Sequence, residues 1–279
     1  MGITLQKIMR DERLLYWLLV IFAAIPLIFP VAFPIPIGSL TKKTYDAVEN
    51  LKENDLVLFT VNMGVTGLPT IGPLMDAYAT HLAQVWELRK IKVILWSTAV
   101  ADAALVVENN VIPYFEKAGM KNEEDYINVG YIPGELTAVA ALATDPKSVV
   151  TTDYYGKPLS QIPLWSRVTH AKDFDLVIVV SGNEIYYYMQ FWGDPFGVRL
   201  LSTTGSPSLG PIAPYLEQGS LYGIIAGKTA AAEYELLQGR IGEALGDVSS
   251  ISFEHILFLF LLILGNLGEI YNRFGGGKK

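Results

Sequence analysis

The stretch DFDLVIVVSGNE, residues 173–184, decides the fold. Two acidic residues precede an apolar run that is mostly β-branched, and the run stops at Ser181. A short apolar run of this kind predicts a strand buried on both faces, as in the middle of a parallel sheet. Its carboxyl end would bring Ser181, Asn183 and Glu184 to the edge where open α/β sheets bind ligands.

Further apolar segments alternate with helical patterns on both sides of this strand. Besides the quoted strand, we expect strands at residues 55–61, 92–97, 126–131, 198–202 and 221–226. Helices are expected at residues 43–50, 70–89, 102–117, 134–143, 184–192, 209–218 and 229–237. This alternation is typical of βαβ units with right-handed crossovers. The sequence therefore predicts an α/β fold, a Rossmann-like, doubly wound, mostly parallel sheet of five or six strands.

Two apolar segments flank this region. The first has no charged side chain, and the second has an apolar centre between acidic ends. A transmembrane helix needs roughly 20 apolar residues, so both segments are predicted to span a membrane. The chain would then comprise an N-terminal segment, a first span, an α/β domain, a second span and a tail, at residues 1–13, 14–37, 38–250, 251–270 and 271–279. The alternative for the first span is a cleaved signal peptide, although no A-x-A cleavage site is present.

Charges near the spans predict the orientation. Those next to the termini are Lys7, Arg10, Arg13, Arg273, Lys278 and Lys279. Those next to the α/β domain are Lys42, Lys43, Lys52 and Arg240. Because cytoplasmic flanks carry the excess of positive charge, we expect cytoplasmic termini and an extracytoplasmic domain. Within the second span, Asn266 is expected to pack helices together through a hydrogen bond of about 0.6 to 2 kcal/mol.

Composition excludes several classes of function. Hydrophobic residues make up 51% of the 279 residues and charged residues only 18%, and mean hydropathy is +0.32, as expected if part of the chain lies in lipid. The net charge of -7 argues against nucleic-acid binding. With no cysteine, disulfides, thiolate nucleophiles and iron–sulfur clusters are excluded. The histidines lack metal-ligand spacing, so no metal is expected, and no cofactor is expected either. His81 is expected to be a satisfied core or boundary residue.

Polar residues that follow the predicted strands form a candidate ligand site. They are Asn62, Gly64, Ser97, Glu135, Ser181, Asn183 and Ser202. The alternative is that these are ordinary turn residues. The glycine loop after the first strand lacks the G-x-G-x-x-G spacing, and Gly227-Lys228-Thr229 lacks the full phosphate-loop pattern. No catalytic constellation is complete, so no catalytic residue is assigned.

Aromatic residues gather in two segments of the domain. They are Tyr154, Tyr155 and Trp165 in a long irregular loop, and Tyr186, Tyr187, Tyr188 and Trp192 in one helix. Aromatic side chains are enriched in the cores of protein interfaces, so an oligomeric surface is one interpretation. Ordinary core packing is the other.

The chain resembles a group of uncharacterised prokaryotic membrane proteins with an N-terminal span, an α/β domain and a C-terminal span. The resemblance rests on DYYGKPLSQIPLW, DFDLVIVV, AAEYELL and LILGN. It supports the architecture and implies no catalytic residue. We expect a membrane-anchored scaffold subunit of a homo- or hetero-oligomeric assembly. The alternative is a membrane-bound sensory domain for a small molecule or nucleotide.

Overall fold

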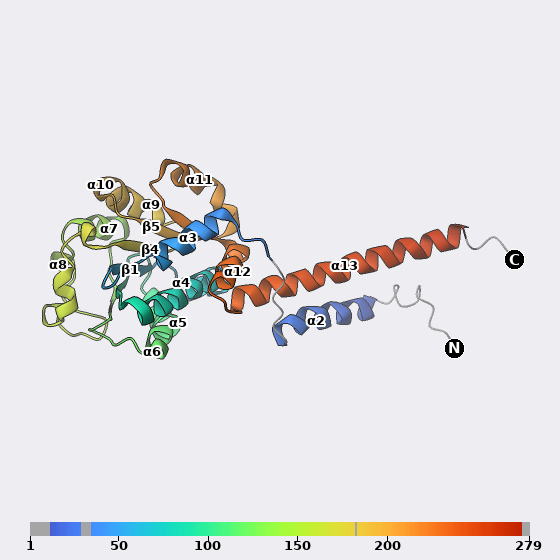
Figure 1. Cartoon of the computed structure of the whole chain (residues 1–279), viewed down its shortest axis with the longest axis horizontal. Helices are drawn as coiled ribbons and strands as arrows, with labels where there is room; N and C mark the ends of the chain where they lie inside the picture. Colours follow the sequence, from blue (N-terminus) through green and yellow to red (C-terminus); the bar gives the residue numbers. More distant parts are fainter. Residues whose placement is uncertain (1–11, 29–34, 182, 275–279) are drawn as a thin grey trace. The chain divides into compact units, whose positions relative to one another are not determined.

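The computed structural model describes residues 12–28, 35–181 and 183–274 (Figure 1). They belong to two compact units: Pro36–Gly242 forms one, while Met1–Ile35 and Glu243–Lys279 form the other. Residues 1–11 of the expected N-terminal segment, residues 29–34 of the expected first span and residues 275–279 of the expected tail lie outside the described residues.

The larger unit is built on a six-stranded parallel sheet. The strands are β1 Leu56–Val61, β2 Lys92–Ser97, β3 Tyr126–Tyr131, β4 Leu176–Val180, β5 Leu200–Thr204 and β6 Gly223–Ala226. Their order, β3-β2-β1-β4-β5-β6, is that of a doubly wound Rossmann-like fold. The predicted fold class is therefore confirmed for this unit. The quoted stretch supplies β4, which pairs with β1 and β5 in the middle of the sheet.

Helices cover both faces of the sheet (Figure 1). One group is joined by mutual contacts and comprises α3 Ser39–Glu49, α4 Leu68–Arg89, α5 Ala103–Asn110, α6 Ile112–Ala118 and α12 Gly227–Leu237. A second group shares one buried cluster with the strand residues of the other face: α7 Glu135–Thr144, α9 Ile185–Tyr188, the π-turn η5 Met189–Gly193 and α11 Leu209–Gln218. Short helical turns α8 Pro146–Val149 and α10 Asp194–Phe196 complete the unit.

Two expected helices are broken in the structure. The single helix expected over residues 102–117 is divided into α5 and α6, because Pro113 in the first turn of α6 has no N–H to continue α5. The helix expected over 184–192 is a short α-helix followed by the π-turn η5. The prediction of one continuous α-helix is therefore wrong in both places, although both segments are helical.

Both sheet edges are covered. At β6, the Ile224 amide donates to Thr44 Oγ1 of α3 at 2.9 Å. At β3, the Tyr154 amide of the irregular loop donates to the Asn128 carbonyl at 2.9 Å. These contacts satisfy edge groups that would otherwise be open to pairing with another strand.

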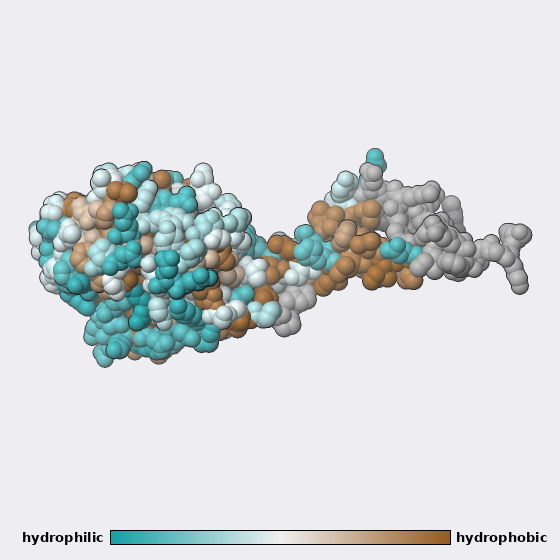
Figure 2. All heavy atoms as spheres, turned by 90° about the horizontal axis from the view of Figure 1, so that it is seen from above, coloured by the Kyte–Doolittle hydropathy of each residue, from teal (hydrophilic) through white to brown (hydrophobic). Residues whose placement is uncertain are grey.

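The second unit consists of α2 Glu12–Ile28 and α13 Glu243–Phe274. Ser250 Oγ donates to the Ala23 carbonyl at 2.9 Å, and the rings of Phe253 and Phe22 lie 6.5 Å apart, so the helices run antiparallel. Among the described residues, one helix is long and apolar enough to cross a membrane, over Glu243–Ile263, while the apolar part of α2 is shorter. Hydrophobic residues gather over this unit (Figure 2).

Candidate functional site

A row of buried polar side chains crosses the sheet at its carboxyl edge. The strand register, continued past the last pairs, aligns Thr98, Asn62, Ser181 and Thr204 on neighbouring strands. All four are almost completely inaccessible to solvent. Since residues aligned across parallel strands point to the same face, the row forms one polar layer. It lies at the switch point between β1 and β4, where doubly wound folds bind their ligands.

Asn62 holds the ends of β1 and β2 together. Its Oδ1 accepts hydrogen bonds from the Thr98 amide at 2.8 Å and the Thr98 hydroxyl at 3.2 Å. Its Nδ2 donates to Thr60 Oγ1 at 3.1 Å. The buried Ser97 hydroxyl, another candidate, donates to the Val100 carbonyl at 3.4 Å. The polar groups of Asn62 and Ser97 are thus engaged within the domain.

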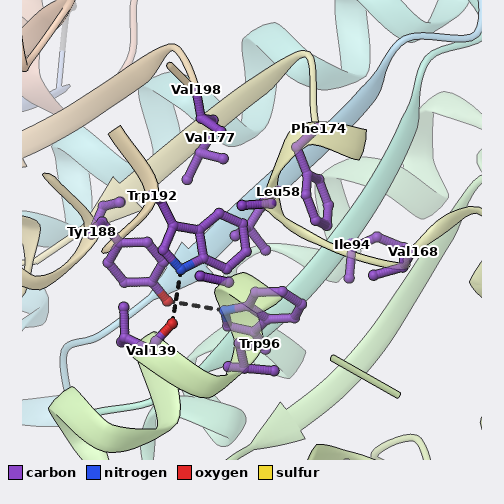
Figure 3. Packing of buried hydrophobic residues seen from close by; sticks show 14 of the residues in the cluster. Leu58, Ile94, Trp96, Val139, Val168, Phe174, Val177, Tyr188, Trp192 and Val198 are labelled. Carbon is purple, nitrogen blue, oxygen red and sulfur yellow. Dashed lines mark hydrogen bonds between the residues drawn. The ribbon is translucent and has the colours of Figure 1, made fainter. Parts of the chain in front are cut away.

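An aromatic cluster that includes Trp96, Tyr188 and Trp192 (Figure 3) is linked to this layer through Thr60, two residues before Asn62. Trp96 Nε1 donates to the Tyr188 hydroxyl at 3.0 Å, and that hydroxyl donates to Thr60 Oγ1 at 3.2 Å. Trp192 Nε1 donates to the Val139 carbonyl at 2.9 Å. Burial raises the pKa of Tyr188. Its phenol is therefore a neutral link between the helical layer and the polar row.

Within the polar row, the hydroxyls of Ser181 and Thr204 make no hydrogen bond to another described residue. Both side chains are fully buried. Ser202, one level below, donates to the Val179 carbonyl at 3.0 Å and is satisfied. An unsatisfied buried hydroxyl costs about 1 to 3 kcal/mol, so each of the two hydroxyls would gain from bonding to a further polar group.

The loop that follows β1 faces a carboxylate. Asp102 Oδ2 accepts a hydrogen bond from the Val65 amide at 3.0 Å. A Cβ atom added to Gly64 would lie 2.5 to 2.9 Å from the Asp102 carboxylate. In dinucleotide-binding folds the phosphates lie against this loop. Here a negative charge stands beside it, which opposes an anionic ligand.

Glu135 and Asn183 are exposed, unlike the residues of the polar row. Glu135 follows β3 at the edge of the sheet, two strands from β1, so it lies roughly 10 Å to the side of the switch point. Asn183 donates its amide to Glu184 Oε2 at 3.2 Å at the start of α9. Four of the candidate ligand residues therefore lie together at the carboxyl edge of the central strands: Asn62, Ser97, Ser181 and Ser202. Glu135 lies away from them at the edge of the sheet.

The seven aromatic candidates do not form one surface. Trp165, Tyr188 and Trp192 are buried within the domain, so they cannot offer their rings to another subunit. Tyr186 and Tyr187 are half-buried, and the ring of Tyr186 packs on that of Tyr215. The exposed ones are Tyr154 and Tyr155. For the three buried rings, core packing is the interpretation that the structure supports.

A second buried polar group was not foreseen. His81 Nδ1 lies 2.8 Å from the Tyr234 hydroxyl, and its Nε2 lies 3.0 Å from Glu49 Oε2. Burial lowers the pKa of His81 to about 4. Of the two expected positions, core and boundary, His81 occupies the core. Its partners come from two other helices, so no local pattern in the sequence indicates them. No cluster of three metal-ligating side chains occurs in the described part of the chain.

Asn266 lies on an exposed face of α13, where its Nδ2 donates to the Leu262 carbonyl of the same helix at 2.9 Å.

Comparison with models of known protein families and with the curated proteins gave no match.

Proposed function

We propose that the chain is a membrane-anchored scaffold, a Rossmann-like subunit of an oligomeric membrane assembly without catalytic activity. The observation that carries the proposal is the apolar surface of the helical unit. Tyr16 and Trp17 of α2 are 65% and 66% exposed, and large apolar side chains of α13 are exposed along its length. Water would penalise this surface by about 25 cal/mol for each Å², whereas lipid would not.

The length of α13 fits a bilayer. The candidate span Glu243–Ile263 begins eight residues before the span expected at residues 251–270, and both stretches lie within α13. With 21 and 20 residues they measure about 30 to 32 Å at 1.5 Å for each residue, against a hydrocarbon core of about 30 Å. The proposed span is residues 251–270, which places Asn266 within the bilayer. The apolar part of α2 that the structure describes, Leu15–Pro26, has 12 residues, or about 18 Å, which is shorter than the hydrocarbon core. Our proposal includes both spans, cytoplasmic termini, an extracytoplasmic domain and membership in the prokaryotic group that the sequence resembles.

Two features favour a scaffold over a nucleotide-dependent enzyme. The Asp102 carboxylate lies where a phosphate would have to bind, and Asn62 is committed to strand pairing. In addition, tethering a domain to the membrane plane raises its effective concentration against neighbouring copies, so modest contacts suffice for assembly. A homo- or hetero-oligomer is the expected state.

Native mass spectrometry of the full chain in mild detergent tests the assembly. We expect a defined oligomer or a complex with a co-purified membrane protein. Monomers alone, at concentrations of tens of micromolar and in several detergents, would contradict the scaffold proposal.

The second candidate is a sensory domain for a small molecule, and the free hydroxyls of Ser181 and Thr204 favour it. A ligand at this point would be polar and either neutral or cationic, because of Asp102. Free ligand at 100 times its Kd stabilises the domain by about 2.7 kcal/mol, so a metabolite screen by thermal shift would detect it. A Ser181→Ala variant should lose the shift. A screen of neutral and cationic metabolites that gives no shift would count against this candidate.

A further inference from the structure

The helix α13 has two different faces. One faces α2 and includes Ser250, Phe253 and Leu257, of which Leu257 is buried. These residues are spaced three and four apart, as expected where one helix packs along another. This is the α2 face.

The opposite face carries another regular series. Its members are Ser252, His255, Leu259, Leu262 and Asn266, with spacings of three, four, three and four. Because each residue turns an α-helix by about 100°, Ser252 lies about 160° around the helix from Ser250. We call this series the Asn266 face. Its spacing is the heptad pattern of helices that pack along one another.

The Asn266 face is open in the single chain. Leu259 and Leu262 are 57% and 46% exposed, and His255 and Asn266 are exposed as well. The face combines two apolar residues at its centre with polar residues at both ends, and it carries no lysine, arginine, aspartate or glutamate. Among the residues that the structure describes, Ser252 and Asn266 donate to carbonyls of their own helix, at 2.8 and 2.9 Å.

Such a face is poorly suited to lipid and well suited to another helix. The Asn266 amide has two N–H donors and a carbonyl acceptor, and the bond to Leu262 uses one donor. In hydrocarbon, polar groups gain by bonding to a neighbouring helix. The leucines between the polar ends would supply the packing.

We propose that a second copy of this chain packs against the Asn266 face, with the two α13 helices parallel and in register. The proposal rests on the membrane anchoring proposed above. Copies of one chain insert with the same topology, so their α13 helices are parallel and each residue meets its own counterpart. Serine and asparagine side chains each both donate and accept hydrogen bonds, so Ser252 and Asn266 are complementary to their own counterparts. A core asparagine also specifies parallel, in-register pairing in coiled coils.

Disulfide trapping in membranes tests this pairing, and the chain has no native cysteine. Leu259→Cys and Leu262→Cys place a thiol on the Asn266 face. Phe260→Cys and Leu267→Cys are the matched controls, since these side chains are 56% and 55% exposed but lie about 100° to 120° from the centre of that face. Each full-length variant is oxidised in native membranes at low expression.

We expect dimers to form at 259 and 262 at least fivefold faster than at 260 and 267. Replacing Asn266 by leucine should weaken dimerisation by about threefold to thirtyfold, the range of interhelical hydrogen bonds in membranes. Equal trapping at all four positions, or none at 259 and 262, would overturn the proposal. If the chain is still membrane-integrated and oligomeric in that case, only this pairing fails; a soluble or monomeric chain would refute the proposed function as well.

Discussion

Replacing Tyr188 by phenylalanine isolates one buried hydroxyl. That hydroxyl accepts the hydrogen bond of Trp96 Nε1 and donates to Thr60 Oγ1. Removing it leaves the Trp96 N–H without its acceptor in a fully buried position, whereas Thr60 keeps its bond from Asn62. A buried donor left without a partner costs about 1 to 3 kcal/mol.

The assay is thermal unfolding of the full chain in detergent, followed by tryptophan fluorescence. At about 3 °C for each kcal/mol in a domain of this size, the Tyr188→Phe variant should melt about 3 to 9 °C below the native chain. Tyr187→Phe makes the same chemical change at the neighbouring half-buried ring and should shift the free energy of unfolding by less than about 0.5 kcal/mol. Equal melting temperatures for the two variants would refute the structural role of the Tyr188 hydroxyl. A changed oligomeric state at unchanged stability would instead restore Tyr188 as an interface residue.

Three further outcomes follow from buried groups and backbone geometry. The pKa of His81 is about 4 in the folded chain and 6.5 in the reference state, so the free energy of unfolding should fall by about 3 kcal/mol as the pH drops from 6.5 towards 4. A His81→Gln variant should lack this part of the pH dependence in denaturation experiments, and an unchanged pH dependence would contradict the assignment. Gly227→Ala should destabilise the domain by at least about 2 kcal/mol, because φ is +75° and the new Cβ would meet the Ser206 hydroxyl. Gly156→Ala, where φ is +85° but no atom lies near the new Cβ, should cost about 1 kcal/mol. Equal melting temperatures for the two variants would contradict the close approach of Ser206 to Gly227. Millimolar NAD or ATP should leave the melting temperature unchanged because Asp102 opposes phosphate, and a shift of more than 2 °C would overturn this.

The sheet was predictable because its signals are local. Each strand is a short apolar run, and the alternation with helices fixes parallel pairing. The bounds of β5 and β6 differ from the prediction, since both strands begin two residues later than expected. The break between α5 and α6 follows from Pro113, a residue that tolerates the first turn of a helix as readily as it ends one.

The candidate site was predictable in position but not in detail. Asn62 and Ser181 follow strands and therefore reach the carboxyl edge. Their partners depend on strand register, which brings Thr98 to one and Thr204 to the other from distant parts of the sequence. The helix containing Tyr188 is apolar all round, so its pattern does not distinguish the core from an interface.

Alkaline carbonate extraction of membranes from cells that express the full chain is the most direct test of the central claim, that α2 and α13 anchor the domain in lipid. The account predicts that the chain stays in the membrane pellet at about pH 11 and is released only by detergent, because exposed apolar side chains of both helices hold it there. Release into the carbonate supernatant would contradict it.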